Sequence, residues 1–303
     1  MGIHRHKVSG DRLFLAIVLN VVITVAQIVG GVISGSLALL SDALHNFSDV
    51  TALTISHVAR TISARKATSR STFGYKRAEI IAALFNASVL VGIGIYLIYE
   101  SVVRFYDPQP VLSSWVIVLG LLGVVVNGGS IWLLEAEAEG SMNIRAAYLH
   151  LLGDTLTSAA VVAGGTAMYF WQIYWVDPLV SVLIALYLIY ASLSLIREST
   201  GVLMEFAPEH IDIEKIAEEV KRVPDIENIH KIHLWRLNDK DLFLQAHLDF
   251  SRNLSLAEVN RRMGEVEKML KERYGISYVV LQPEYMRKDE KFLIEGESHD
   301  NRE

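Results

Sequence analysis

The stretches His45-Asn-Phe-Ser-Asp49 and His150-Leu-Leu-Gly-Asp154 repeat one pattern, in which an imidazole precedes a carboxylate by four residues. Both lie inside long apolar stretches that are typical of membrane helices. Residues four apart share a helix face, so each copy offers a nitrogen and an oxygen to a common point. An ionised Asp near the centre of a spanning helix costs roughly 2.5 to 3.5 kcal/mol. A divalent ion held between the two helices would neutralise both carboxylates, and imidazole with carboxylate suits zinc.

Side chains of these types can also hydrogen-bond across a helix bundle and bind nothing. One copy of the pattern would not decide between the two interpretations. Two copies in matching context favour a four-ligand intramembrane metal site made of His45, Asp49, His150 and Asp154. The copies are separated by the same 105 residues at both positions, which suggests three spans plus three spans related as an inverted repeat.

Composition divides the chain into a membrane part and a soluble part. The 303 residues are 51% hydrophobic with a mean hydropathy of +0.32, too apolar for an ordinary soluble protein. Six stretches are long enough to span a bilayer: 13–34, 37–59, 79–103, 112–134, 146–171 and 177–198. We therefore expect a six-span membrane domain over 1–205, a cytoplasmic domain over 206–287 and a charged, disordered tail over 288–303.

Loop charge predicts the orientation of the membrane domain. Six cations and no acidic residue lie between Arg60 and Arg77, whereas the loops near Gly35, Pro108 and Tyr174 carry almost none. Cytoplasmic loops are enriched in Lys and Arg, so both termini should be cytoplasmic in a multi-pass protein of the cell inner membrane. The chain has no cysteine, which excludes thiolate ligands. The expected partners are metal ions, protons and the lipid bilayer, and not nucleic acid.

The last third of the chain has the pattern of a small α+β domain. Residues 211–222 and 255–274 read as helices, and 229–237, 242–250 and 277–285 as strands. The resulting order, αββαβ, predicts two helices on one face of a three-stranded sheet.

The chain resembles the zinc-transporting branch of the cation diffusion facilitator family. Three stretches carry the resemblance: Ser36 to His45, Asn143 to Asp154, and the later His233-Leu-Trp235. The resemblance extends to about Met286. It implies a homodimer with metallochaperone-like cytoplasmic domains that exports divalent metal against inward proton flow. It also implies that His45, Asp49, His150 and Asp154 form the transport site, and the His at position 45 resembles the zinc-preferring branch.

The chemistry of imidazole supports the same coupling. An unperturbed His has a pKa near 6.5 and must lose its proton before it binds a metal. Metal and protons would therefore compete for His45 and His150. With access from alternating sides, shared occupancy predicts a zinc and proton antiporter.

The resemblance also implies a cytoplasmic zinc site, to which His233, His247 and Glu284 correspond. The alternative is that these are half-buried strand residues. Positions that hold further ligands in some relatives are Asn260, Leu281 and Pro283 here, so a two-ion cluster is not expected.

Other function classes fit the sequence less well. His45 and His150 could be axial haem ligands in an electron carrier or enzyme, but a porphyrin favours an apolar pocket and each His has a carboxylate one turn away. The His-Glu-x-x-His pattern of metalloproteases is absent from the sequence. A passive channel would need weaker ion binding than four ligands give. We therefore expect a transporter and not an enzyme.

Overall fold

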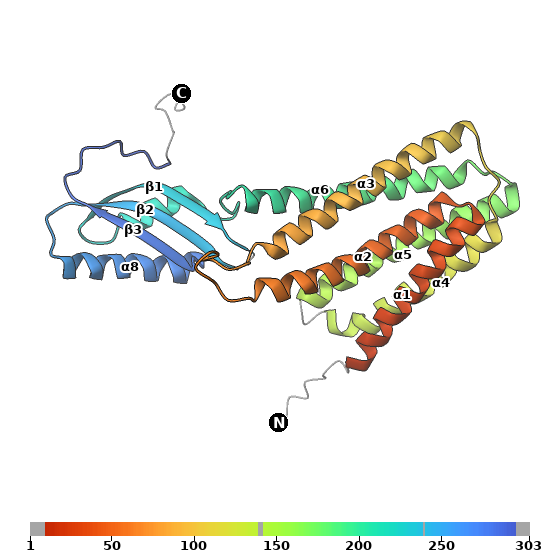
Figure 1. The fold of residues 1–303 in the computed structure, drawn as a ribbon, viewed down its shortest axis with the longest axis horizontal. Coiled ribbons are helices and arrows are strands. Elements are labelled where there is room, and N and C mark those ends of the chain that lie inside the picture. The colour runs from red at the N-terminus through yellow and green to blue at the C-terminus, as the bar shows by residue number, and fades with distance from the viewer. Residues whose placement is uncertain (1–9, 139–141, 239, 295–303) are drawn as a thin grey trace. The chain divides into compact units, whose positions relative to one another are not determined.

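The computed structural model describes residues 10–138, 142–238 and 240–294 (Figure 1). The side chains of residues 10–19, 53, 132–138, 142–147, 149 and 150 are outside this description. The chain forms two compact units. Unit 1 comprises Met1–Val58 and Ala82–Ile196, and unit 2 comprises Ala59–Ile81 and Arg197–Glu303.

Six long helices follow one another in the region expected to cross the membrane, and each overlaps one expected span. They are α1 (Gly10–Ser34), α2 (Leu37–Ser63), α3 (Ala78–Tyr106), α4 (Ser113–Ala138), α5 (Met142–Trp171) and α6 (Val176–Leu203). Three described segments are long and apolar enough to span a bilayer: Ala78–Tyr106, Ser113–Ile131 and Val176–Leu203. Asn20–Ser34 is a shorter apolar helix. The count of six spans stays a prediction.

Small residues let the helices of unit 1 approach closely. The helix α4 packs against α5 and α1. A Cβ atom added at Gly120 would lie 2.7 Å from the Val162 side chain, and one added at Gly94 would lie 2.7 Å from Ile189 of α6. Without a hydrophobic driving force inside a bilayer, such close packing is a main source of helix association.

The amino-terminal end of α2 is fixed to α6. The carboxylate of Asp177 accepts hydrogen bonds from the Ser36 hydroxyl at 2.5 Å and the Leu37 amide at 2.7 Å. An acidic side chain is favourable there because the first amides of a helix have no partner within the helix. One turn further, the hydroxyls of Ser41 and Ser181 lie 2.7 Å apart. These contacts set the rotation of α2 and hence the direction in which its polar residues point.

Unit 2 contains the small sheet domain that the sequence predicts. Its elements are α7 (Ile213–Val220), β1 (Ile226–Arg236), β2 (Leu242–Phe250), α8 (Leu256–Tyr274) and β3 (Tyr278–Glu284). The strands lie in the order β1-β2-β3, with β1 antiparallel and β3 parallel to β2. The helix α8 begins with a capping box between Ser255 and Glu258 and ends at Gly275, whose φ of 68° suits glycine.

The two faces of the sheet differ in character. Leu244, Ala246 and Leu248 of β2 point into one buried cluster that also contains Ile216 of α7 and Leu270 of α8. Both helices therefore cover the same face, as expected. Successive strand residues point to opposite faces, so the intervening residues of β2 point away from the helices.

An irregularity in β1 changes which residues face each other across the sheet. His233 pairs with Gln245, but His230 pairs with His247, and the register shifts between these two pairs. If the register that pairs His233 with Gln245 continued for two more residues, Lys231 would lie opposite His247. Lys231 instead takes a φ of 51°, in the left-handed region that a β-bulge uses.

The segment after β3 hydrogen-bonds to the backbone of β1 at this irregularity. The amides of Lys231 and Ile232 donate to the carbonyls of Phe292 and Leu293 at 3.0 and 2.9 Å. Residues 288–294 lie in the stretch that the sequence predicts to be a charged, disordered tail, and they are among the described residues. Their carbonyls satisfy backbone donors of β1 that do not pair with β2. The rest of the expected tail, 295–303, lies outside the described residues.

Candidate metal centres

Three of the four predicted transport ligands meet between α2 and α5. His45 Nε2 lies 3.1 Å from Asp154 Oδ1, and His45 Nδ1 lies 3.8 Å from Asp49 Oδ2. One ligand atom from each residue can be chosen so that all lie within 4.8 Å of one another. His45 and Asp154 are buried and Asp49 is half-buried. The structure thus brings a nitrogen and two carboxylates to one point within unit 1.

His150 lies in α5 one turn before Asp154, and its side chain is outside the described part of the structure. Its backbone position is the one that the pattern requires, because residues four apart share a helix face.

A buried carboxylate outside the predicted ligand set lies one helical turn before His45. Asp42 is fully buried and accepts hydrogen bonds from Gln27 at 3.2 Å, Ser158 at 2.8 Å and Thr157 at 2.9 Å. The Thr157 hydroxyl is also 2.9 Å from the Asp154 carbonyl. These contacts join α1, α2 and α5 directly beside the proposed ligands. In the sequence, this contact could have been anticipated from the polar residues Gln27, Thr157 and Ser158, which lie inside otherwise apolar helices.

An aromatic side chain of α6 forms one wall of the site. The rings of His45 and Tyr187 meet edge to face, with centroids 6.1 Å apart. A Cβ atom added at Gly153 would lie 3.1 Å from the Tyr187 hydroxyl, so glycine leaves room for this ring.

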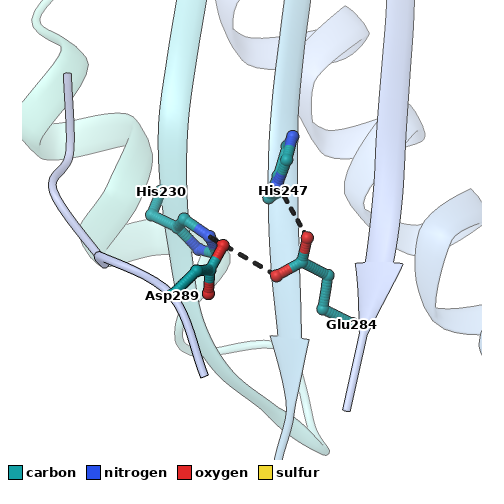
Figure 2. Close-up of side chains that lie close together, drawn as sticks. All are labelled: His230, His247, Glu284 and Asp289. Atoms are coloured by element: carbon teal, nitrogen blue, oxygen red, sulfur yellow. Dashed lines mark ion pairs between the residues drawn. The ribbon is translucent and has the colours of Figure 1, made fainter. Parts of the chain in front are cut away.

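A second group of imidazoles and carboxylates lies on the sheet face that points away from α7 and α8 (Figure 2). It comprises His230 of β1, His247 of β2, Glu284 of β3 and Asp289 from the segment after β3. One ligand atom from each lies within 4.8 Å of the others. His247 Nδ1 is 2.8 Å from Glu284 Oε1, and His230 Nε2 is 3.6 Å from Glu284 Oε2.

The imidazole nitrogens and carboxylate oxygens of this group are better placed to bind a metal than to hydrogen-bond to one another. Both ring nitrogens of His230 and Nδ1 of His247 are buried without a hydrogen bond of good geometry among the described residues. Burial lowers the pKa of His230, because desolvation disfavours the imidazolium, and a neutral imidazole is the form that binds metal. Two imidazoles and two carboxylates around one point suit a tetrahedral zinc ion.

Cations from the segment after β3 contact the same carboxylates. Lys291 Nζ lies 2.6 Å from Asp289 Oδ1, 2.7 Å from Asp249 Oδ1 and 3.2 Å from Glu284 Oε2. Arg287 lies 2.8 Å from Glu284 Oε1.

These contacts shift the acid–base equilibria of the groups involved. Hydrogen bonding to Lys291 lowers the pKa of Asp289 to about 2. Desolvation opposes the charge of Lys291, but its hydrogen bonds to Asp249, Asp289 and Glu284 outweigh this and raise its pKa. The Glu284 pKa is lowered in the same way, since the Lys291 hydrogen bond and nearby charges outweigh desolvation.

The cytoplasmic group differs from the expected ligand set by one exchanged residue and one added residue. His247 and Glu284 come together as the resemblance implied, and His230 takes the place expected for His233. His233 is exposed and lies opposite Gln245. The register shift in β1 explains the difference, because it brings His230 opposite His247. Asp289 was missed since it lies in the segment expected to be disordered.

Comparison with known families covers almost the whole chain. The model of the cation efflux transmembrane domain matches residues 13–204, and that of the cytoplasmic domain of cation efflux proteins matches residues 208–286. The chain belongs to the cation diffusion facilitator family. The resemblance seen in the sequence is thereby confirmed, as is the expectation of a membrane transport protein and not an enzyme.

Several relatives are similar over most of their length. The zinc transporter ZitB of Pectobacterium atrosepticum is 33% identical over 98% of this chain and 96% of its own. The cadmium, cobalt and zinc/H(+)-K(+) antiporter of Bacillus subtilis is 32% identical over 98% of this chain and 94% of its own. The metal cation efflux system protein CzcD of Cupriavidus metallidurans is 34% identical, with 92% and 88% covered.

Proposed function

We propose that this protein exports zinc across a membrane in exchange for protons, using a site formed by His45, Asp49, His150 and Asp154. The observation that carries the proposal is the convergence of His45, Asp49 and Asp154 on one point between two helices of the transmembrane domain. His150 completes the set by its place in α5. Relatives named as zinc transporters and as a zinc antiporter support the choice of substrate and coupling.

The coupling follows from the chemistry of the ligands. His45 lies against a carboxylate on either side, and its ring can carry a proton or bind a metal, but not both through one nitrogen. Zinc loading from one side would release protons, and proton loading from the other side would release zinc. Net exchange then requires only that the site opens alternately to the two sides.

The arrangement in the membrane is proposed from the sequence and the helices together. All six helices of the first region would span the cell inner membrane, with both termini cytoplasmic because cations crowd 60–77. Polar ligands in α2 and α5 lower their apolar character, as functional spans of transporters commonly show. The cytoplasmic dimerisation domain of the family favours a homodimer.

The cytoplasmic group is proposed as a second zinc site that is not on the transport path. His230, His247, Glu284 and Asp289 would hold one zinc ion on the sheet, in agreement with the unsatisfied donor atoms described above. Bound zinc would join β1, β2, β3 and the segment after β3, and so stabilise the domain.

Reconstitution into liposomes tests the proposed function. Zinc added outside vesicles that contain a pH-sensitive dye and the wild-type protein should drive protons outward as zinc enters. Asp154→Asn should remove both movements, whereas His247→Gln, outside the membrane site, should retain them. Zinc flux without proton movement would refute the exchange mechanism, and unchanged flux in Asp154→Asn would refute the site.

A further inference from the structure

The ammonium group of Lys291 lies among the carboxylates of the cytoplasmic group, in contact with Asp249, Glu284 and Asp289. We propose that Lys291 is a tethered competitor of the metal, so that zinc enters this group by displacing the ammonium, and that this competition sets the affinity and selectivity of the site. The inference rests on the cytoplasmic zinc site proposed above.

The competition arises because the ammonium and the metal would use the same two carboxylate groups. Lys291 Nζ is 3.2 Å from Glu284 Oε2 and 2.6 Å from Asp289 Oδ1, and both residues are in the ligand set. A zinc ion bonded to these carboxylates at about 2.0 to 2.2 Å would strongly repel an ammonium at that position. The side chain of Lys291 must therefore move before the carboxylates can bind zinc.

The backbone of the segment keeps the ammonium close to the site. The hydrogen bonds from Lys231 and Ile232 to the carbonyls of Phe292 and Leu293 anchor the residues directly after Lys291. A tethered group acts at a high effective concentration, so competition persists at any protein dilution. The Lys291 side chain is 31% exposed, so it can swing into solvent without opening the sheet.

Selectivity follows from the charge that Lys291 supplies. Three carboxylates close together would attract hard cations such as Mg²⁺ and Ca²⁺, which prefer oxygen ligands. Lys291 neutralises part of that charge, and a hard cation gains little from the imidazoles of His230 and His247. Zinc binds imidazole well and can therefore replace the ammonium where Mg²⁺ cannot.

Zinc titration of the full-length protein in detergent tests the inference, with one matched control. His247→Gln identifies the cytoplasmic site by the zinc equivalent that it loses. Lys291→Met should bind that equivalent about tenfold more tightly than wild type, since the competing ion pairs are gone. Millimolar Mg²⁺ should weaken zinc binding in Lys291→Met and leave wild type unchanged. Lys288→Met removes an exposed charge on the same segment and should bind zinc as wild type does.

The outcomes separate this inference from the site on which it rests. If His247→Gln loses no zinc equivalent, the cytoplasmic site is refuted, and the role of Lys291 with it. If the equivalent is lost but Lys291→Met binds zinc no more tightly than Lys288→Met, only the competition is refuted.

A second measurement uses the wild-type protein and does not depend on how well a variant folds. An amine-reactive reagent followed by mass spectrometry reports the accessibility of each lysine. Zinc should increase the labelling of Lys291 severalfold, because the displaced ammonium leaves its carboxylates, while Lys288 should not change. Labelling of Lys291 that stays constant or falls on zinc addition would overturn the proposal.

Discussion

The two groups of imidazoles and carboxylates differ in the source of the positive charge beside their carboxylates. In the cytoplasmic group this charge comes from Lys291 and Arg287, which remain cationic at any physiological pH. Beside Asp154 in unit 1 lies the imidazole of His45, which is positive only when it holds a proton. The adjacent Asp42 accepts hydrogen bonds from neutral donors. Without bound metal, charge compensation is thus independent of protonation in the cytoplasmic group and depends on a proton in the other, as the proposed transport site requires.

The largest expected effect separates the two groups by transport. Asp154→Asn removes a carboxylate ligand and should lower zinc flux in proteoliposomes by more than about 100-fold, since even outer-shell changes cost 10- to 100-fold in metal affinity. His247→Gln should leave the flux within about threefold, because an ion held outside the path is not translocated. Equal losses in the two variants would contradict the division into a transport site and a retained site.

The next effect concerns the neutral donors beside the membrane group. Asp42→Leu removes the acceptor of the Ser158 hydroxyl, at about 1 to 3 kcal/mol for an unsatisfied buried group, and leaves Thr157 and Gln27 with only their bonds to the Asp154 and Leu119 carbonyls. The variant should therefore lower zinc flux about tenfold or more. Asp42→Asn keeps one acceptor oxygen and should recover part of the loss. Ser88→Ala on α3 is the control, because among the described residues that hydroxyl bonds only within its own helix, to the Leu84 carbonyl. Full activity in Asp42→Leu would show that this contact does not position the site.

The same contrast explains what could be predicted from the sequence. The helices could be predicted from long apolar runs, and the strands from alternating polar and apolar residues. The paired His and Asp ligands could be predicted from their spacing of four residues. Local periodicity dictates all of these features. The partners of Asp42 could not be foreseen, since they come from α1 and α5 and depend on helix rotation. The choice of His230 over His233 depends on one irregular residue, Lys231, whose effect on register appears only when β1 and β2 pair.

A smaller effect should follow from crowding the donors of Asp42 without removing them. A Cβ atom at Gly123 of α4 would lie 2.7 Å from Gln27 Nε2 and 3.0 Å from the Ser158 hydroxyl, whereas one at Gly128 would meet nothing within 4 Å. Gly123→Ala should therefore lower zinc flux severalfold, by shifting groups that a displacement of about 1 Å can misalign. Gly128→Ala, with the same change of composition in the same helix, should keep the wild-type flux. Equal behaviour of the two variants would remove the proposed role of this contact.

The smallest effect concerns the permanent charge of the cytoplasmic group and its dependence on pH. The Asp289 pKa is lowered from 3.8 to about 2, so its ionised form stabilises the folded state. This contribution is complete above about pH 4 and is lost as the pH falls toward 2. Without metal, the melting temperature of Asp289→Asn should lie a few degrees below wild type at both pH 7 and pH 4.5, with the difference shrinking toward pH 2.5. A difference that disappears already between pH 7 and pH 5 would contradict this assignment.

Proton release on zinc binding measures the exchangeable charge of the membrane group directly. Calorimetric titration near pH 6 in two buffers of different ionisation enthalpy gives the number of protons released with each zinc ion. In the His247→Gln background, which leaves the membrane site alone, zinc binding should release protons, and His45→Ala should release fewer. Zinc binding at that site without proton release at pH 6 would contradict the claim that metal and protons share the same ligands.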